Sequence, residues 1–176
     1  MKSNCFSFEH NDRKYYINVE THQVMNSDYH SLSKSELQSV RLNGLNDTLI
    51  DCLRPRSEHE IQKHARLANE TENYELAGRL VTILLDKNNK NPVAMAINCS
   101  LLRAQNKSKE AYLEFVDYVN RGGQATHAIL TSVAAALLDM KNIKSAKKYA
   151  DRAYAMLNGK ATDHLNQVYR SIRSLS

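Results

Sequence analysis

The sequence contains little of the material that β-rich folds need. Among its 176 residues there is no tryptophan, and there are only five glycines and two prolines, which leaves few turn residues for an all-β fold. Hydrophobic residues make up 42% of the chain and charged residues 24%, a composition typical of globular rather than disordered proteins. We therefore expect a mainly helical protein.

Long apolar runs and paired cysteines are also missing. No stretch approaches the roughly 20 apolar residues of a membrane-spanning helix, and the first residues do not resemble a secretory signal. Cys5, Cys52 and Cys99 are odd in number and have no paired spacing, which argues against a disulfide framework or a zinc ribbon. We expect buried or partly buried thiols. These features predict a cytoplasmic protein without membrane attachment.

The N-terminal residues alternate between apolar and polar types. Phe6 and Phe8 follow this pattern, and Ile17 and Val19 continue it after a polar turn. A period of two is typical of strands, so the sequence predicts a β-hairpin. An isolated hairpin is marginal in water, and we expect these four side chains to pack on the helical body or on another molecule. A weaker pattern at residues 24–25 suggests a short third strand.

A helical pattern begins at Ser33. Ser33 and Glu36 have the spacing of a capping box, which predicts a helix starting near Lys34. Gly44 costs about 1 kcal/mol relative to alanine inside a helix, so we expect a break or kink there. The helix that resumes afterwards should end at residues 54–55, because a residue before proline is biased away from helical geometry.

Beyond Pro55 the sequence repeats itself. An alanine near the start of a helix recurs at Ala77, Ala111 and Ala146, with spacings of 34 and 35 residues. The preceding helix also repeats, and its small side chains allow the two helices of a pair to approach closely. These small residues are Ala65, Cys99 and Ala134.

In this period and in these positions the chain resembles the tetratricopeptide repeat family. His64 and Asn98 depart from the family pattern, because they stand where the family prefers leucine. The resemblance implies a mainly α protein, an α–α superhelix of helical hairpins with a small N-terminal β-hairpin or meander and linking helices. The predicted organisation is an N-terminal β-hairpin and helical segment at 1–56 and a repeat domain at 57–176, with repeats at about 58–91, 92–125 and 127–159 and a capping helix at 162–174.

The resemblance also implies a binding surface. In such repeats the first helices line a concave groove, and small side chains there leave room for a segment of another protein. Arg66 and Arg103 are suited to pair with a carboxylate of that segment. Alternatively, the small residues only permit tight packing of the superhelix. The candidate groove residues are Gln62, Arg66, Asn69, Val93, Ala96, Ser100, Arg103, Ala128, Thr131, Ala135 and Leu138.

The sequence favours binding over catalysis. It has no nucleophile motif, no glycine-rich phosphate loop and no H-E-x-x-H pattern, so we predict no enzyme activity, no cofactor and no metal site. The seven histidines are interpreted as surface or groove polarity. The leading hypothesis is a non-catalytic adaptor or scaffold that binds another protein. An alternative is a small chaperone for a secreted or unfolded client, similar to the compact three-repeat chaperones of bacterial secretion systems in size and repeat number.

Two further interpretations rest on other segments. A basic stripe within residues 141–152, comprising Lys141, Lys144, Lys147, Lys148 and Arg152, could meet nucleic acid, but a solvated outer face is favoured because only Tyr149 interleaves with the charges. The N-terminal β unit could also self-associate by pairing the edge of its sheet with a second copy.

Overall fold

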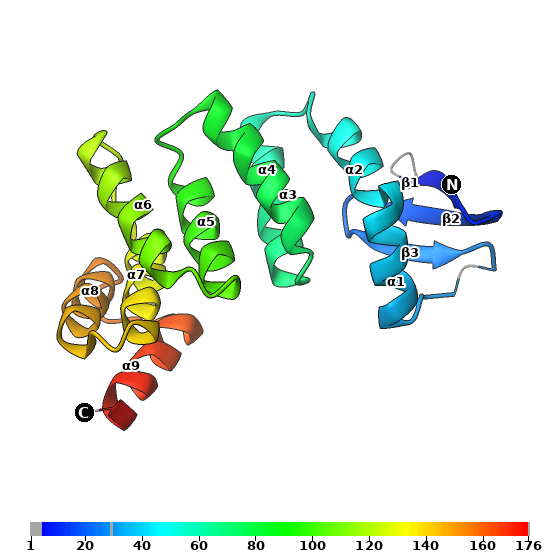
Figure 1. Ribbon diagram of the computed structural model, residues 1–176. Coiled ribbons are helices and arrows are strands. Elements are labelled where there is room, and N and C mark those ends of the chain that lie inside the picture. The colour runs from blue at the N-terminus through cyan, green and yellow to red at the C-terminus, as the bar shows by residue number, and fades with distance from the viewer. Residues whose placement is uncertain (1–4, 29, 176) are drawn as a thin grey trace. The chain divides into compact units, whose positions relative to one another are not determined.

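The computed structural model describes residues 5–28 and 30–175, with the backbone alone at residues 42 and 43. These residues form a mainly helical protein with a small antiparallel sheet (Figure 1). The chain divides into two compact units, Met1–Ile83 and Leu84–Ser176, each described by itself below. No helix in the described part is long and apolar enough to cross a membrane.

The N-terminal sheet has the strand order β1-β2-β3, formed by Cys5–His10, Arg13–Asn18 and Gln23–Asn26. A two-residue loop joins β1 to β2. Both of its residues, Asn11 and Asp12, have positive φ angles of 50° and 58°, as a type I′ hairpin turn requires. The predicted hairpin and the weakly indicated third strand are therefore confirmed.

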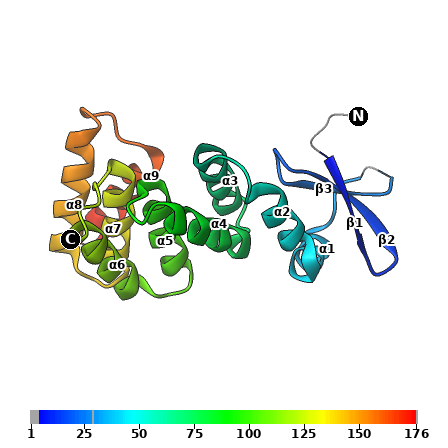
Figure 2. The ribbon, with the colours of Figure 1, turned by 90° about the horizontal axis from the view of Figure 1, so that it is seen from above.

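One face of this sheet packs towards the helical segment that follows it, and α1 and α2 lie beside it (Figure 2). On that face Ile17 is fully buried, and Val19, which follows β2, is fully buried as well. Phe8 is half-buried, with its ring next to Gly44. Phe6 belongs to the same face but keeps 42% of its surface exposed, so the expected burial holds for three of the four side chains.

The helical segment after the sheet contains the predicted irregularity. Helix α1 (Lys34–Val40) is capped by the side chain of Ser33, as predicted, and α2 spans Asn46–Leu53. Between them lies a π-helical turn, η1 (Arg41–Leu45). Gly44 within this turn has a φ of +105°, a conformation that favours glycine, which explains why the helix changes its geometry there.

The rest of the chain consists of helices joined by short turns. Six of them lie within the three segments predicted as helix pairs, and the last extends one residue past the predicted capping helix. These helices are α3 (Glu58–Glu70), α4 (Tyr74–Lys87), α5 (Pro92–Ala104), α6 (Ser108–Asn120), α7 (His127–Asp139), α8 (Ile143–Met156) and α9 (Asp163–Leu175).

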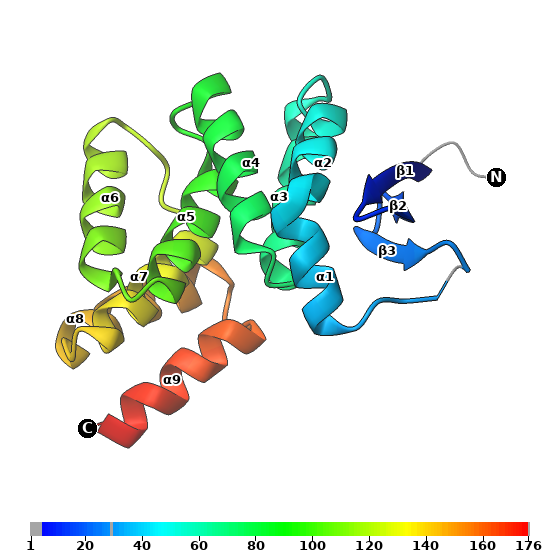
Figure 3. The same ribbon diagram turned by 45° about the vertical axis from the view of Figure 1, so that its right-hand side comes forward.

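Helix α7 forms the centre of the C-terminal unit. It packs against α5, α6, α8 and α9, and α9 lies along α7 and α8 (Figure 3). Every residue from Ile129 to Leu138 is buried. Small side chains make this close approach feasible, since Ala134 on α7 and Ala146 and Ala150 on α8 are all fully buried. The apolar core of this unit therefore surrounds α7.

Candidate partner-binding surfaces

The N-terminal unit has an open cavity of about 510 Å³ beside helix α3. Two residues predicted for the groove, Gln62 and Arg66, lie in its wall one turn apart. The Gln62 side-chain amide donates to Glu58 Oε1 at 3.3 Å. The residues lining the cavity are Glu20, Thr21, His59, Gln62, Lys63, Arg66, Leu67 and Glu70.

The charges in this cavity differ in how far they are already paired. Glu20 accepts from Arg56 Nη1 at 2.9 Å and from Lys63 Nζ at 3.1 Å. These hydrogen bonds lower the pKa of Glu20 to about 2, and the bond from Arg56 has the larger effect. Arg66 is exposed, and in the described part of the chain no carboxylate lies within ion-pair distance of it. Its guanidinium is therefore the cation of this cavity that is free to bind a carboxylate of another molecule.

A buried histidine pair lies next to this cavity. His22 precedes strand β3 and His64 belongs to α3; their exposed fractions are 6% and 1%. His22 Nε2 lies 3.1 Å from His64 Nδ1, and the two rings stack with centroids 5.2 Å apart. His64 Nε2 faces Glu20 Oε2 at 3.9 Å. The pair therefore joins the sheet to α3, and the interpretation of all histidines as surface or groove polarity is wrong for these two.

The burial of this pair sets its protonation. Burial lowers the pKa of His22 to about 4, and the neighbouring His64 and Arg41 contribute in the same direction. Burial also lowers the pKa of His64, although Glu20 opposes the shift. Both rings are therefore neutral at pH 7, where the pair can share one hydrogen bond between a donor and an acceptor nitrogen. The remaining ring nitrogens, His22 Nδ1 and His64 Nε2, have no hydrogen-bond partner among the described residues.

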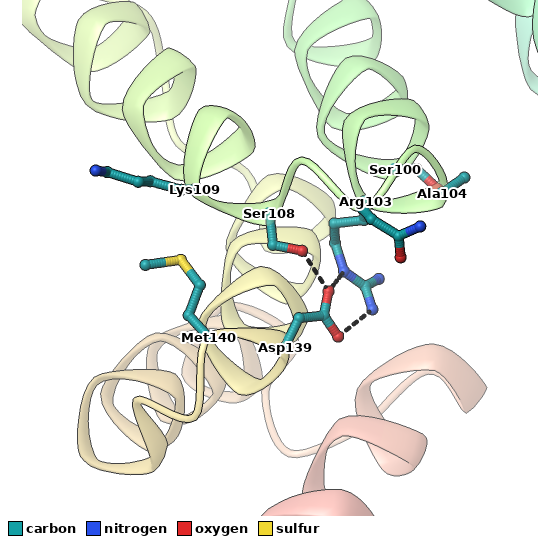
Figure 4. Close-up of a pocket in the computed structure, with 8 residues that line it drawn as sticks. Ser100, Arg103, Ala104, Ser108, Lys109, Asp139 and Met140 are labelled. Atoms are coloured by element: carbon teal, nitrogen blue, oxygen red, sulfur yellow. Dashed lines mark hydrogen bonds and ion pairs between the residues drawn. The ribbon is translucent and has the colours of Figure 1, made fainter.

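The C-terminal unit has a second open cavity, of about 780 Å³ (Figure 4). Arg103, at the end of α5, donates from Nε to Asp139 Oδ2 at 2.8 Å and from Nη2 to Oδ1 at 3.3 Å. Ser108 Oγ donates to the same carboxylate at 2.7 Å. Arg103 was expected to be a free partner for a carboxylate, but Asp139 already holds it. The cavity is lined by Ser100, Arg103, Ala104, Asn106, Ser108, Lys109, Asp139 and Met140.

The candidate residues on α7 are mostly closed off. Thr131, Ala135 and Leu138, expected at an open groove, are buried with exposed fractions of 2%, 4% and 9%. The reason is the packing of four helices around α7, which uses their small size for close contact. Ala128, in the first turn of α7, is the one candidate on this helix that is exposed. On α7, small side chains therefore serve packing, the alternative interpretation of the sequence.

The three remaining candidates are half-buried. Val93 and Ala96 lie on α5 and line neither cavity. Asn69 lies near the end of α3, and its Oδ1 is buried without a hydrogen-bond partner among the described residues. The structure thus brings together Gln62 with Arg66 and Ser100 with Arg103, each pair within its own unit.

The basic stripe on α8 is exposed, but some of its charges are already engaged. Lys147 Nζ pairs with Asp151 at 2.7 Å, and the guanidinium of Arg152 lies 5.9 Å from the centre of the Tyr149 ring. Lys148 is exposed on the same helix. These contacts are those of a solvated helix face with local charge pairs.

The cysteines differ in burial. Cys99 is fully buried, and this burial raises the pKa of its thiol to about 12. Cys52 is half-buried, as expected. Cys5 on strand β1 is exposed, so the expectation of a buried or partly buried thiol is wrong for this residue. In the described ranges no three His, Cys, Asp or Glu side chains converge as metal ligands would.

No protein-family model, curated protein or solved structure matches this chain. The cavity beside α3 presents the unpaired guanidinium of Arg66. In the cavity at the end of α5 the guanidinium of Arg103 is paired with Asp139, and among the described residues the unpaired cation there is the Lys109 ammonium, which lacks a bidentate fork.

Proposed function

We propose that this protein is a non-catalytic adaptor of the cytoplasm that binds an acidic segment of another protein. The observation that carries the proposal is Arg66, an exposed guanidinium without an ion-pair partner among the described residues, in the wall of an open cavity. A tetratricopeptide-like superhelix belongs to the same proposal. Its support is the 34- and 35-residue spacing of Ala77, Ala111 and Ala146, together with the paired helices that carry them.

The chemistry of the cavity indicates the kind of segment. A guanidinium presents a planar fork of donors that fits a carboxylate in a bidentate geometry. Leu67 supplies an apolar surface one residue away. Glu20 repels a carboxylate little, because Arg56 and Lys63 already pair with it. A segment with a carboxylate next to an apolar side chain fits this surface.

Affinity purification of the tagged protein from its native host tests the proposal. The partner should co-purify with the original chain and with Lys148→Glu, which alters an exposed charge on α8. It should be lost from Arg66→Glu, because charge reversal places a carboxylate where the partner's carboxylate binds. Arg66→Lys should weaken the capture without abolishing it, since it keeps the charge and loses the bidentate fork.

Other results would redirect the assignment. A partner retained by Arg66→Glu contradicts the site. Capture of many unfolded chains instead of a fixed partner would favour the chaperone interpretation over the adaptor.

A further inference from the structure

One edge of the sheet is open along its full length within the described residues. Strand β3 is covered on its outer side at its last two residues, where Met25 pairs with Ser31 and the Asn26 N–H donates to the His30 carbonyl at 3.0 Å. Strand β1 pairs with β2 on one side, and no described residue pairs with it on the other. Open edges bind other strands unless charge, proline or a bulge prevents it.

The hairpin geometry tells which backbone groups face this edge. In a two-residue hairpin the pair next to the loop, here His10 and Arg13, is hydrogen-bonded across the two strands. Hydrogen-bonded and non-hydrogen-bonded pairs alternate along β1, so the backbone N–H and carbonyl groups of Phe6 and Phe8 also bond to β2. The N–H and carbonyl groups of the alternate residues then point outward, and the side chains of these residues are exposed. These residues are Cys5, Ser7 and Glu9.

We propose that β1 pairs antiparallel with β1 of a second copy, about a two-fold axis through Ser7, to form one six-stranded sheet. Ser7 then lies opposite Ser7 of the second copy, and Cys5 lies opposite Glu9. All three outward-facing residues form hydrogen-bonded pairs in this register, giving about six backbone hydrogen bonds. Moving the axis to Phe8 would leave Cys5 unpaired and only about four bonds, so Ser7 is favoured.

The side chains are complementary in the same register. Phe6 lies opposite Phe8 of the second copy in a non-hydrogen-bonded pair, the closer of the two cross-strand arrangements, and aromatic pairs there are favourable. Phe6 is the one apolar side chain of the packed face that stays 42% exposed, so the second copy covers the open end of that face. Glu9 is the only acidic residue of β1, and it meets no like charge because Cys5 lies opposite.

The β1 edge is a different surface from the cavity beside α3, so its pairing does not depend on the proposed function. The occupant is a second copy, since a strand that is complementary to itself needs no other partner. Homodimers most often have two-fold symmetry, which this pairing supplies.

Disulfide trapping in the full chain tests the register. The variant Cys5→Ser with Ser7→Cys places two thiols opposite each other at a Cα distance of about 5.5 Å, within the range for a disulfide. It should form a covalent dimer in a glutathione redox buffer. The matched control, Cys5→Ser with Glu9→Cys, separates its two thiols by four residues, about 14 Å, and should stay monomeric on a non-reducing gel. Cys52 and Cys99 are common to both.

Light scattering on the uncrosslinked chain gives a second readout. The original chain and Ser7→Ala should show a dimer mass at high concentration, whereas Ser7→Pro should be monomeric, because proline removes the N–H at the axis while sparing the bonds to β2. A monomer with no trapped dimer overturns the proposal, as does equal trapping of both cysteine variants. A dimer that survives Ser7→Pro places the interface elsewhere. Mixed disulfides with other proteins alone would assign the edge to a foreign strand.

Discussion

The two units of the molecule bury polar groups in different ways. The N-terminal unit pairs polar side chains with each other across long stretches of sequence. His22 meets His64 from 42 residues away, and Asn46 and Asn73 exchange amide hydrogen bonds, with Asn73 Nδ2 donating to Asn46 Oδ1 at 2.9 Å. Buried polar networks of this kind stabilise a structure only while every member keeps its partner.

Among the described residues, the buried polar side chains of the C-terminal unit carry no titratable group: they are Asn91, Ser108, Thr131 and Ser132. Ser108 bonds to Asp139 from 31 residues away, whereas two of the others bond within their own helix. Asn91 accepts from the N–H groups of Val93 and Ala94 in its own helix cap, and the Thr131 hydroxyl donates to the His127 carbonyl one turn away. Apart from Thr131 and Ser132, the buried side chains of α7 are apolar. The difference implies that stability depends on protonation in the N-terminal unit and on side-chain volume in the C-terminal unit.

Acidification should therefore destabilise the N-terminal unit more than the C-terminal unit, and this is the largest effect that we predict. The folded-state pKa of His22 is about 4, below its usual value of 6.5, so the unfolded state binds the proton more readily between these values. Stability is then fully present above pH 6.5 and is lost as the pH falls towards 4, by about 3 kcal/mol from His22. His64 acts in the same direction. Hydrogen exchange, corrected for intrinsic rates, should show α3 losing protection well before α7.

The double variant His22→Asn with His64→Leu is the control for this comparison. It removes both titrating rings, and asparagine tolerates the positive φ of 55° at position 22. The pH dependence of protection in α3 should shrink in this variant. Equal loss of protection in α3 and α7 in the original chain would contradict the assignment to the histidine pair.

The separation of contacting residues along the chain explains what could be predicted from the sequence. The hairpin, the Ser33 cap and the break at Gly44 depend on neighbouring residues, so local patterns revealed them. The His22–His64 contact and the Arg103–Asp139 pair join distant residues, and no local pattern reports such contacts. One clue was present for His64, because it occupies a position where the resembled family prefers leucine, which is a core position.

The second-largest effect is expected when a core alanine of the C-terminal unit is enlarged, which should lower the stability of that unit. Ala134 is fully buried where α7 packs against its neighbours, so Ala134→Leu should overpack the core and cost about 1 to 3 kcal/mol. Urea unfolding followed by far-UV circular dichroism gives the free energy of unfolding. Ala128→Leu is the matched control, since Ala128 is exposed on the same helix and should change stability by less than about 0.5 kcal/mol. If the two substitutions cost the same, α7 does not pack as described.

The smallest effect is expected at the basic stripe. Lys148 is exposed on α8 between Lys144 and Arg152, four residues away on either side, so glutamate there gains two favourable neighbours in place of two repulsive ones. Lys148→Glu should therefore leave the free energy of unfolding within about 0.5 kcal/mol of the original. The same variant tests the nucleic-acid interpretation by fluorescence anisotropy with a single-stranded oligonucleotide at low salt. A solvated face predicts weak binding that barely changes, whereas a large loss of affinity at unchanged stability would show that the stripe contacts phosphates.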